Sequence, residues 1–222
     1  MSPVSESSGV ASRLRSERSR DKRQLILESA IKVFARAGYH GSRISDIARE
    51  AGVAYGLVYH YFKNKEEILD TIFEENWSGF LEAVELIADT PASTEDRLLS
   101  LAALILSAYR VRADWVKVLV FELQRSSRFA EPEQIRAVGR LFKSVAGILR
   151  AGQEAGELRN DIDPDVACFV FIGGLDIVVT SGVLGVIKID GGAEAESEYF
   201  LRVGHTVVDL CLNGLRVGAE RA

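Results

Sequence analysis

Side chains that can form hydrogen bonds gather in one short stretch, residues 43–65, where two expected helices meet at Gly52. On the second helix Tyr55, Tyr59 and His60 are spaced so that they face outward together. Small residues begin this helix and let its backbone come close to a base edge or a phosphate, while the hydroxyl and imidazole groups supply hydrogen bonds. The pattern is typical of a helix-turn-helix that enters the major groove of DNA.

Apolar residues at helical spacing must hold these two helices in place. The first helix carries Ile47, Ala48 and Ala51 on one face, and the second can turn Val53, Leu57, Val58 and Phe62 towards a core. Gly52 lets the chain leave the first helix sharply, because a positive φ costs glycine almost nothing. A supporting helix is expected before this pair, capped by Asp21 with Gln24 reaching back and ended by Gly38.

Positive charge is concentrated in the same part of the chain. Up to Lys65 there are twelve basic and six acidic residues, against fifteen basic and twenty-six acidic residues in the remainder. The net charge of −5 for the whole chain therefore hides a basic N-terminal part. This asymmetry fits a protein that meets a polyanion at one end only.

Several motifs in this region together resemble the tetracycline-repressor (TetR) family of bacterial regulators. The similarity covers roughly Arg20 to Phe80 and rests on Gly38-Tyr39, Ile47-Ala48, Ala51-Gly52-Val53, Gly56, Tyr59, Tyr61-Phe62 and Lys65-Glu66-Glu67-Ile68-Leu69. It implies that operator DNA is contacted by Tyr55, Tyr59, His60 and Lys65, with Ala54 and Gly56 allowing a close approach and Arg43 and Ser45 near the DNA backbone. Arg43 departs from the hydroxyl residue usual at its position. Tyr61 is expected to be structural, and Lys63 either binds phosphate or is simply solvated.

The domain organisation follows from composition and from the end of the motif. Residues 1–19 contain seven serines and no aromatic residue and are expected to be a disordered basic arm, either reaching phosphates or only aiding solubility. Residues 20–66 form the expected DNA-binding domain, and residues 67–222 an effector-binding and dimerisation domain. No apolar run before Ser19 looks like a signal peptide, so a cytoplasmic bacterial protein, at the nucleoid when bound to DNA, is expected.

After residue 65 the sequence is a succession of helical patterns. Pro91, Pro132 and Pro164 lie where a helix can start, which suits a residue without an amide hydrogen. The expected helices are 65–89, 94–110, 113–127, 132–156, 163–187 and 195–216. Together with the three-helix head they predict an all-α fold of about nine helices.

The segment 166–187 is apolar, with Asp176 as its one ionisable residue, and is long enough to span a bilayer. A charge at the middle of a membrane helix is costly, and the next segment is amphipathic, so an oligomer interface is the better interpretation. The TetR resemblance implies dimerisation through the last two helices as a four-helix bundle. The expected interface residues are Phe169, Gly173, Ile177, Val203, Val207 and Leu210.

The middle of the chain is rich in apolar residues, and the TetR resemblance implies a ligand cavity there. The stretch from Phe121 to Ser127 resembles the fatty-acid-responsive branch of the family, which implies long-chain acyl-CoA as the small hydrophobic effector. The candidate effector-binding residues are Leu104, Tyr109, Phe121, Arg125, Arg128 and Phe142. A regulator of an efflux or detoxification gene that senses a drug-like aromatic ligand is an alternative.

No catalytic arrangement is recognisable. His40, His60 and His205 stand in unrelated contexts, and Cys168 and Cys211 lack metal-binding or redox spacing, so no metal, cofactor or enzymatic activity is expected. The sequence thus predicts a homodimeric, ligand-responsive repressor that binds palindromic double-stranded operator DNA and is released by its effector. A helical protein-interaction module that does not bind DNA is the alternative from another class.

Overall fold

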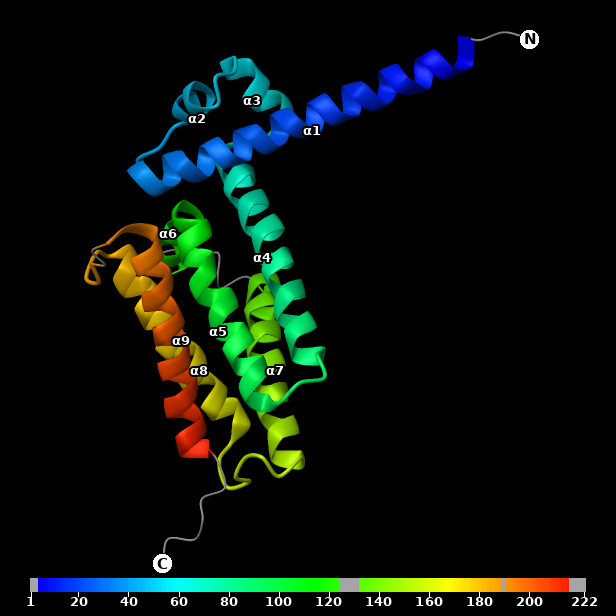
Figure 1. Ribbon diagram of the computed structural model, residues 1–222. Coiled ribbons are helices and arrows are strands. Elements are labelled where there is room, and N and C mark those ends of the chain that lie inside the picture. Colours follow the sequence, from blue (N-terminus) through cyan, green and yellow to red (C-terminus); the bar gives the residue numbers. More distant parts are fainter. Residues whose placement is uncertain (1–3, 124–131, 189–190, 216–222) are drawn as a thin grey trace, which may run out of the picture. The chain divides into compact units, whose positions relative to one another are not determined.

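The computed structural model of the chain describes residues 4–123, 132–188 and 191–215, and within these ranges it contains helices and no strand (Figure 1). The all-α prediction is therefore confirmed. The helices are α1 (Val4–Ala37), α2 (Ile44–Glu50), α3 (Tyr55–Tyr61), α4 (Lys65–Asp89), α5 (Thr94–Val111), α6 (Ala113–Leu123), α7 (Pro132–Glu154), α8 (Pro164–Val183) and α9 (Gly192–Leu215).

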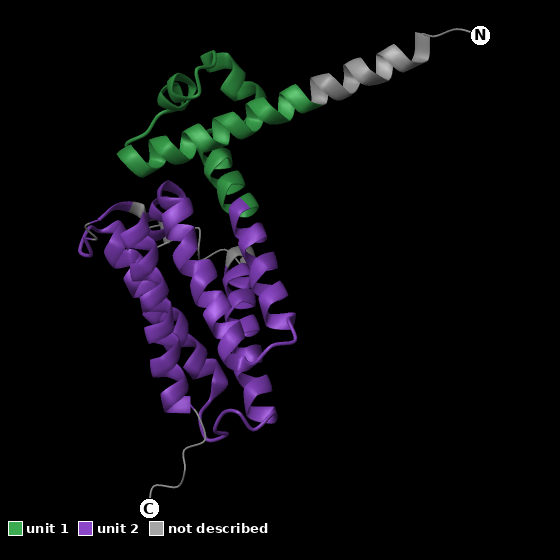
Figure 2. Ribbon diagram, viewed as in Figure 1, with its two compact units in different colours: residues 1–75 green, residues 76–222 purple. Residues whose placement is uncertain are grey.

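The chain divides into two compact units, residues 1–75 and residues 76–222 (Figure 2). The expected boundary after residue 66 falls within α4, and the structure places the division after Glu75 instead. The first turns of α4 belong to the first unit because Ile68, Leu69 and Ile72 are buried in it, each at most 1% exposed. Helix α4 thus begins in one unit and ends in the other.

The first unit is built on two glycines that end helices. Gly38, with φ of 71°, ends α1, and Gly52, with φ of 63°, ends α2, so both adopt the left-handed conformation that glycine tolerates best. The buried side chains Ile26, Ile47 and Val58 come from α1, α2 and α3 and are fully shielded from solvent. This shared core fixes the turn between α2 and α3.

Helix α1 begins earlier than expected. The cap predicted at Asp21 is wrong, because Asp21 lies inside α1, and the helix already begins at Val4 where a disordered arm was expected. No proline follows Pro3 before the end of this helix, so no residue in the segment lacks the amide hydrogen that a helix needs. A helix anchored by a buried C-terminal half extends at little cost, since the expensive step is nucleation.

The second unit contains a bundle in which α5 packs against α9, α7 against α8, and α8 against α9 (Figure 1). Two of its helices begin with a side-chain cap. The Ser93 hydroxyl accepts a hydrogen bond from the Asp96 amide at 3.1 Å, and the Asp163 carboxylate accepts one from the Asp165 amide at 2.8 Å. The core is formed by Leu98, Leu101, Ala102, Leu106, Val145, Leu149, Phe171, Leu175, Val208 and Leu212.

The helix boundaries in this unit follow the predicted ones closely, with small differences at α7, α8 and α9. Helix α7 ends at Glu154 rather than at residue 156, and α8 ends at Val183 rather than at residue 187. Gly185, with φ of 71°, turns the chain soon after α8. Helix α9 begins at Gly192 rather than at residue 195. The last residues expected in the helix 113–127 lie outside the described ranges.

Helix α8 is long and apolar enough to cross a membrane by length and composition. Only 28% of its most apolar window is buried within the chain. Phe169, Val170 and Ile177 stay 56%, 65% and 61% exposed, and Leu210 on the neighbouring helix α9 is 68% exposed. Part of the surface of α8 and α9 is thus apolar and uncovered in the single chain.

Candidate nucleic-acid interface

Two tyrosines on α3 form an exposed pair. Tyr55 and Tyr59 are 53% and 46% exposed, and their hydroxyl oxygens are 3.1 Å apart in a hydrogen bond. Their rings meet edge to face, with centroids 5.1 Å apart. The hydrogen bond from Tyr55 raises the pKa of Tyr59 above its usual value of about 10, so this phenol stays protonated at neutral pH.

The pairing limits what the two hydroxyls can donate. Each hydroxyl carries one hydrogen, and the bond between them uses one of the two. The pair therefore offers one remaining donor together with acceptor lone pairs, which suits either a base edge or a phosphate oxygen. Ala54, Gly56 and His60 are also exposed, so the outward set of α3 is the one expected from the sequence.

The beginning of α2 is exposed as well. Arg43 and Ser45 lie on the surface, and the Arg43 amide donates to the Asp46 carboxylate at 3.1 Å, which caps the helix. Asp46 also accepts a hydrogen bond from the Arg49 guanidinium at 3.1 Å. The cap uses the backbone amide of Arg43, and the residue itself is exposed at the start of α2.

Tyr61 ties α3 to α1. Its hydroxyl is 3.2 Å from the Ser19 hydroxyl, and its side chain is half-buried, so the structural role expected for it agrees with these contacts. The Arg23 guanidinium lies 5.6 Å from the centre of the Phe62 ring and bonds Glu75 on α4 at 2.6 Å. These contacts join α1 to the end of α3 and to α4.

Lys65 differs from the other expected DNA contacts. Its ammonium donates to the backbone oxygen of Tyr39 at 2.5 Å and to that of Ser42 at 2.8 Å. It also lies 4.3 Å from the centre of the Tyr39 ring. The sequence reasoning missed these contacts because 26 residues separate Lys65 from Tyr39.

The described residues contain no group of three or more side chains suited to hold a metal ion. Cys168 is buried and Cys211 half-buried, and both are free thiols. Burial raises the pKa of both thiols, which keeps them in the less reactive protonated form. Among the described residues, the exposed face of α2 and α3 carries hydrogen-bonding side chains suited to contact a nucleic acid.

Comparison with known protein families identifies the family to which this chain belongs. Residues 26–72 match the family described as "Bacterial regulatory proteins, tetR family", and residues 73–205 match the family described as "YsiA-like protein, C-terminal region". The two matches adjoin and cover most of the chain. The chain belongs to the TetR family. Its relatives in this family are transcriptional regulators, not enzymes.

Three similar proteins illustrate the relationship. The fatty acid metabolism regulator protein of Bacillus subtilis (strain 168) is 30% identical over 88% of this chain and 96% of its own length. The structure of the fatty acid degradation regulator FadR from Bacillus halodurans has a TM-score of 0.74 and 27% identity, covering 89% of this chain and 97% of that one. FadR from Bacillus subtilis in complex with stearoyl-CoA has a TM-score of 0.72 and 29% identity, covering 86% and 98%.

In this TetR-family chain the expected effector residues lie on three helices of the second unit. Leu104 and Tyr109 on α5, Phe121 on α6 and Phe142 on α7 are all half-buried. The Phe142 ring is paired with Phe169 of α8, with centroids 4.7 Å apart. Arg125 and Arg128 lie outside the described residues.

Tyr109 is packed tightly against two other helices. Its ring meets Phe200 of α9 edge to face, with centroids 5.4 Å apart. A Cβ atom added to Gly182 of α8 would come within 2.9 Å of Tyr109 Cζ, so only glycine leaves room for the phenol. Burial, with a smaller effect of Glu196, raises the pKa of Tyr109. Part of the Tyr109 ring is therefore used in packing α5 against α8 and α9.

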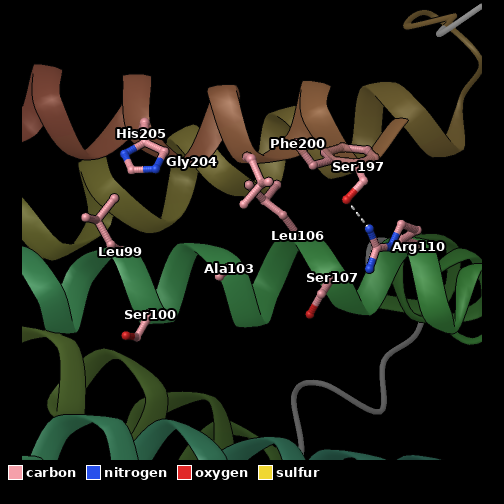
Figure 3. Close-up of a pocket in the computed structure, with 11 residues that line it drawn as sticks. Leu99, Ser100, Ala103, Leu106, Ser107, Arg110, Ser197, Phe200, Gly204 and His205 are labelled. Atoms are coloured by element: carbon pink, nitrogen blue, oxygen red, sulfur yellow. Dashed lines mark hydrogen bonds between the residues drawn. The ribbon is translucent and has the colours of Figure 1, made fainter. Parts of the chain in front are cut away.

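A pocket of about 430 Å³ opens between α5 and α9 (Figure 3). None of the four expected effector residues that the structure describes lines it. Leu99 and His205 lie towards one end in Figure 3, and at the other end the Arg110 guanidinium donates a hydrogen bond to the Ser197 hydroxyl. The lining residues are Leu99, Ser100, Ala103, Leu106, Ser107, Arg110, Ser197, Phe200, Leu201, Gly204 and His205.

The expected dimer residues are partly exposed. Phe169, Gly173, Ile177 and Leu210 are on the surface, whereas Val203 and Val207 are half-buried. Gly174 of α8 lies close to Val207 of α9, because a Cβ atom added to this glycine would be 3.4 Å from Val207 Cγ1. One side of α9 is therefore packed on α8 within the chain. Phe169, Ile177 and Leu210 remain on the surface.

Proposed function

We propose that this TetR-family protein is a homodimeric transcriptional repressor whose helix α3 reads the major groove of operator DNA. The support is the exposed outward face of α3 and the basic character of the chain up to Lys65. The contacting residues in this proposal are Arg43, Ser45, Ala54, Tyr55, Gly56, Tyr59 and His60. Basic side chains near the middle of α1, such as Arg18 and Lys22, are exposed and add positive charge.

The proposed effector is a long-chain acyl-CoA, and the regulated genes are those of fatty-acid metabolism. One observation carries this proposal: the chain matches fatty acid regulators over nearly their full length, in sequence and in structure. One of these relatives is in complex with stearoyl-CoA. The apolar middle of the second unit, which includes Leu104, Tyr109, Phe121 and Phe142, offers the chemistry that an acyl chain needs.

The proposed dimer forms through α8 and α9. Phe169, Ile177 and Leu210 are each more than half exposed, and apolar surface of this kind on a single chain is typical of an interface between proteins. A two-fold dimer places two copies of α3 on symmetric half-sites, which are about one helical turn of DNA apart in such complexes. Palindromic operator DNA is the matching partner, and the cytoplasm, at the nucleoid, is the place of action.

The proposed mechanism is a shift between two populations. DNA favours the form of the dimer in which both heads fit successive major grooves, and the effector favours a form in which they do not. An effector can move this balance only by its difference in affinity for the two forms. Acyl-CoA binding should therefore weaken operator binding as its concentration rises, up to a limit set by that difference in affinity.

The test is a release assay with matched ligands. An operator is first selected from a random-sequence duplex library with the purified protein. Its complex is then titrated with stearoyl-CoA, octanoyl-CoA, free stearate and CoA, while fluorescence anisotropy reports the bound fraction. Stearoyl-CoA is expected to release the duplex at the lowest concentration, because a longer chain buries more apolar surface.

Two results would contradict this proposal in different ways. Release by an aromatic drug-like ligand but not by stearoyl-CoA would favour the efflux or detoxification regulator. No binding to any duplex, together with salt-insensitive binding to a protein partner, would favour a protein-interaction module. Native mass spectrometry of the freshly purified protein supplies an independent measurement, because a co-purified acyl-CoA adds a defined mass.

A further inference from the structure

Lys65 is the first residue of α4, and its side chain points back to the connection between α1 and α2. The ammonium donates to the Tyr39 and Ser42 backbone oxygens at 2.5 and 2.8 Å and lies over the Tyr39 ring at 4.3 Å. The side chain is half-buried, unlike those of Tyr55 and Tyr59. An ammonium has three N–H groups, and two of them are engaged with these oxygens.

The carbonyl groups that Lys65 binds lie just beyond the end of α1. Gly38 has turned the chain out of the helix, and the Tyr39 oxygen accepts a hydrogen bond from the Ser42 amide at 3.3 Å in the turn that follows. The buried Ser42 hydroxyl also donates to the Tyr39 oxygen, at 2.7 Å. Lys65 and Ser42 together hold the connection in a single shape.

This connection leads directly into the DNA-reading helices. Arg43 caps α2 immediately after Ser42, and α2 shares a core with α3 through Ile47 and Val58. A displacement of the connection would therefore move α2 and α3 as one body. Contacts with DNA depend on positioning to within a fraction of an ångström, so such a movement would weaken them.

We infer that Lys65 is a positioning residue, which orients α2 and α3 from the start of α4 and does not neutralise a DNA phosphate. This revises the expectation drawn from sequence resemblance, and it rests on the proposed DNA-binding function. A phosphate that drew the ammonium away would leave the Tyr39 and Ser42 oxygens without this donor. In this inference the positive charge of Lys65 binds the backbone oxygens of Tyr39 and Ser42 instead of a DNA phosphate.

Lys63 is the matched control. It lies two residues before Lys65 and carries the same charge, and its side chain is exposed. The contact that anchors its backbone is the donation of its amide to the Glu67 carboxylate at 2.5 Å, which a side-chain substitution leaves in place. Replacing either lysine by glutamine removes one positive charge from each copy of the chain.

The experiment measures DNA affinity over a series of salt concentrations. The probe is a fluorescein-labelled duplex of mixed sequence, about 30 base pairs long, which spans about three helical turns. The proteins are wild type, Lys65→Gln, Lys65→Arg and Lys63→Gln, all as full chains. The logarithm of the binding constant falls linearly with the logarithm of salt concentration, and each phosphate contact adds about 0.9 to the slope.

Lys65→Gln is expected to weaken binding by about tenfold at every salt concentration, with the wild-type slope and a lower midpoint of thermal unfolding. Lys65→Arg should not restore full affinity, because a planar guanidinium does not reproduce a compact ammonium over the Tyr39 ring. In the control Lys63→Gln, the midpoint of thermal unfolding should stay at the wild-type value.

A slope that falls by about one per copy in Lys65→Gln, with wild-type affinity in Lys65→Arg, would overturn the inference in favour of a phosphate contact. Should Lys65→Gln fail to fold, Lys65→Arg decides, since it keeps the positive charge and changes only the shape of the donor. Weaker binding at an unchanged slope supports the positioning role, and wild-type affinity refutes it. Failure of the DNA-binding proposal itself would appear in the wild-type protein, which would then not bind the duplex.

Discussion

The exposed tyrosine pair on α3 gives the sharpest test of how this chain reads DNA. Changing Tyr55 or Tyr59 to phenylalanine removes one hydroxyl and leaves the ring in place. Both side chains are about half exposed, so the free energy of unfolding should change by less than about 0.5 kcal/mol in either variant. Any larger effect on DNA affinity then reports a contact with DNA.

The size of that effect follows from the number of hydrogen bonds lost. One hydrogen bond contributes about 0.5–1.5 kcal/mol, and the proposed dimer presents two copies of each hydroxyl. Each single variant should therefore weaken operator binding by about 1–3 kcal/mol, which corresponds to roughly 5–150-fold. We expect Tyr55→Phe to lose more on the selected operator than on mixed-sequence duplex, and Tyr59→Phe to lose equally on both.

The hydrogen bond between Tyr55 and Tyr59 adds a further expectation. Because the two hydroxyls are bonded at 3.1 Å, removing one changes the orientation of the other, and the two substitutions should not be independent. The double variant should lose less affinity than the sum of the single variants, by about 0.5 kcal/mol or more. Fluorescence anisotropy of all four proteins on both duplexes measures this, and losses that are additive and equal on both duplexes would refute the reasoning.

Three further predictions concern the second unit. Gly182→Ala places a methyl group 2.9 Å from Tyr109 Cζ and should lower the midpoint of thermal unfolding, by about 2–4 °C for each kcal/mol of strain. The control Gly79→Ala should not lower this midpoint, because a methyl group at that position has no neighbouring atom within 4 Å. Partial desolvation raises the pKa of the Asp176 carboxyl although its side chain reaches the surface, so this group destabilises the fold as pH rises above about 3.8. Asp176→Asn should raise the unfolding midpoint slightly at pH 7 and change nothing at pH 3. Ile177→Glu should turn the dimer into monomers in analytical ultracentrifugation and weaken operator binding, and a dimer that persists at micromolar concentration would show that α8 is not the interface.

Much of the fold could be predicted because local residues mark the ends of the helices. Pro132 and Pro164 each begin a helix in the structure, and Gly38 and Gly52 end helices where the sequence pattern placed their ends. Helix-ending and helix-starting residues of this kind act on the few residues around them, so they can be recognised without knowing how the rest of the chain folds. The start of α1 was missed because composition alone suggested disorder, whereas a helix with a well-anchored end extends readily.

The candidate site was predictable in part for the same reason. The outward residues of α3 follow from helical spacing, and Tyr55 and Tyr59 are exposed as expected. The contacts of Lys65 with Tyr39 and Ser42, in contrast, join residues that are 26 and 23 positions apart. The pocket between α5 and α9 likewise brings Arg110 to Ser197, which is 87 residues away. Contacts of this range depend on how whole helices pack, and no local pattern specifies them.

The uncovered apolar residues of α8 and α9 also bear on how the protein is made. Phe169, Val170 and Ile177 face outward on every newly folded copy, and surfaces of this kind adhere to whatever apolar partner they meet first. Copies translated from one messenger RNA emerge close together, at a local concentration far above the cellular average. The proposed dimer through α8 and α9 would cover these side chains, so synthesis on a shared message would favour this dimer over contacts with other apolar partners.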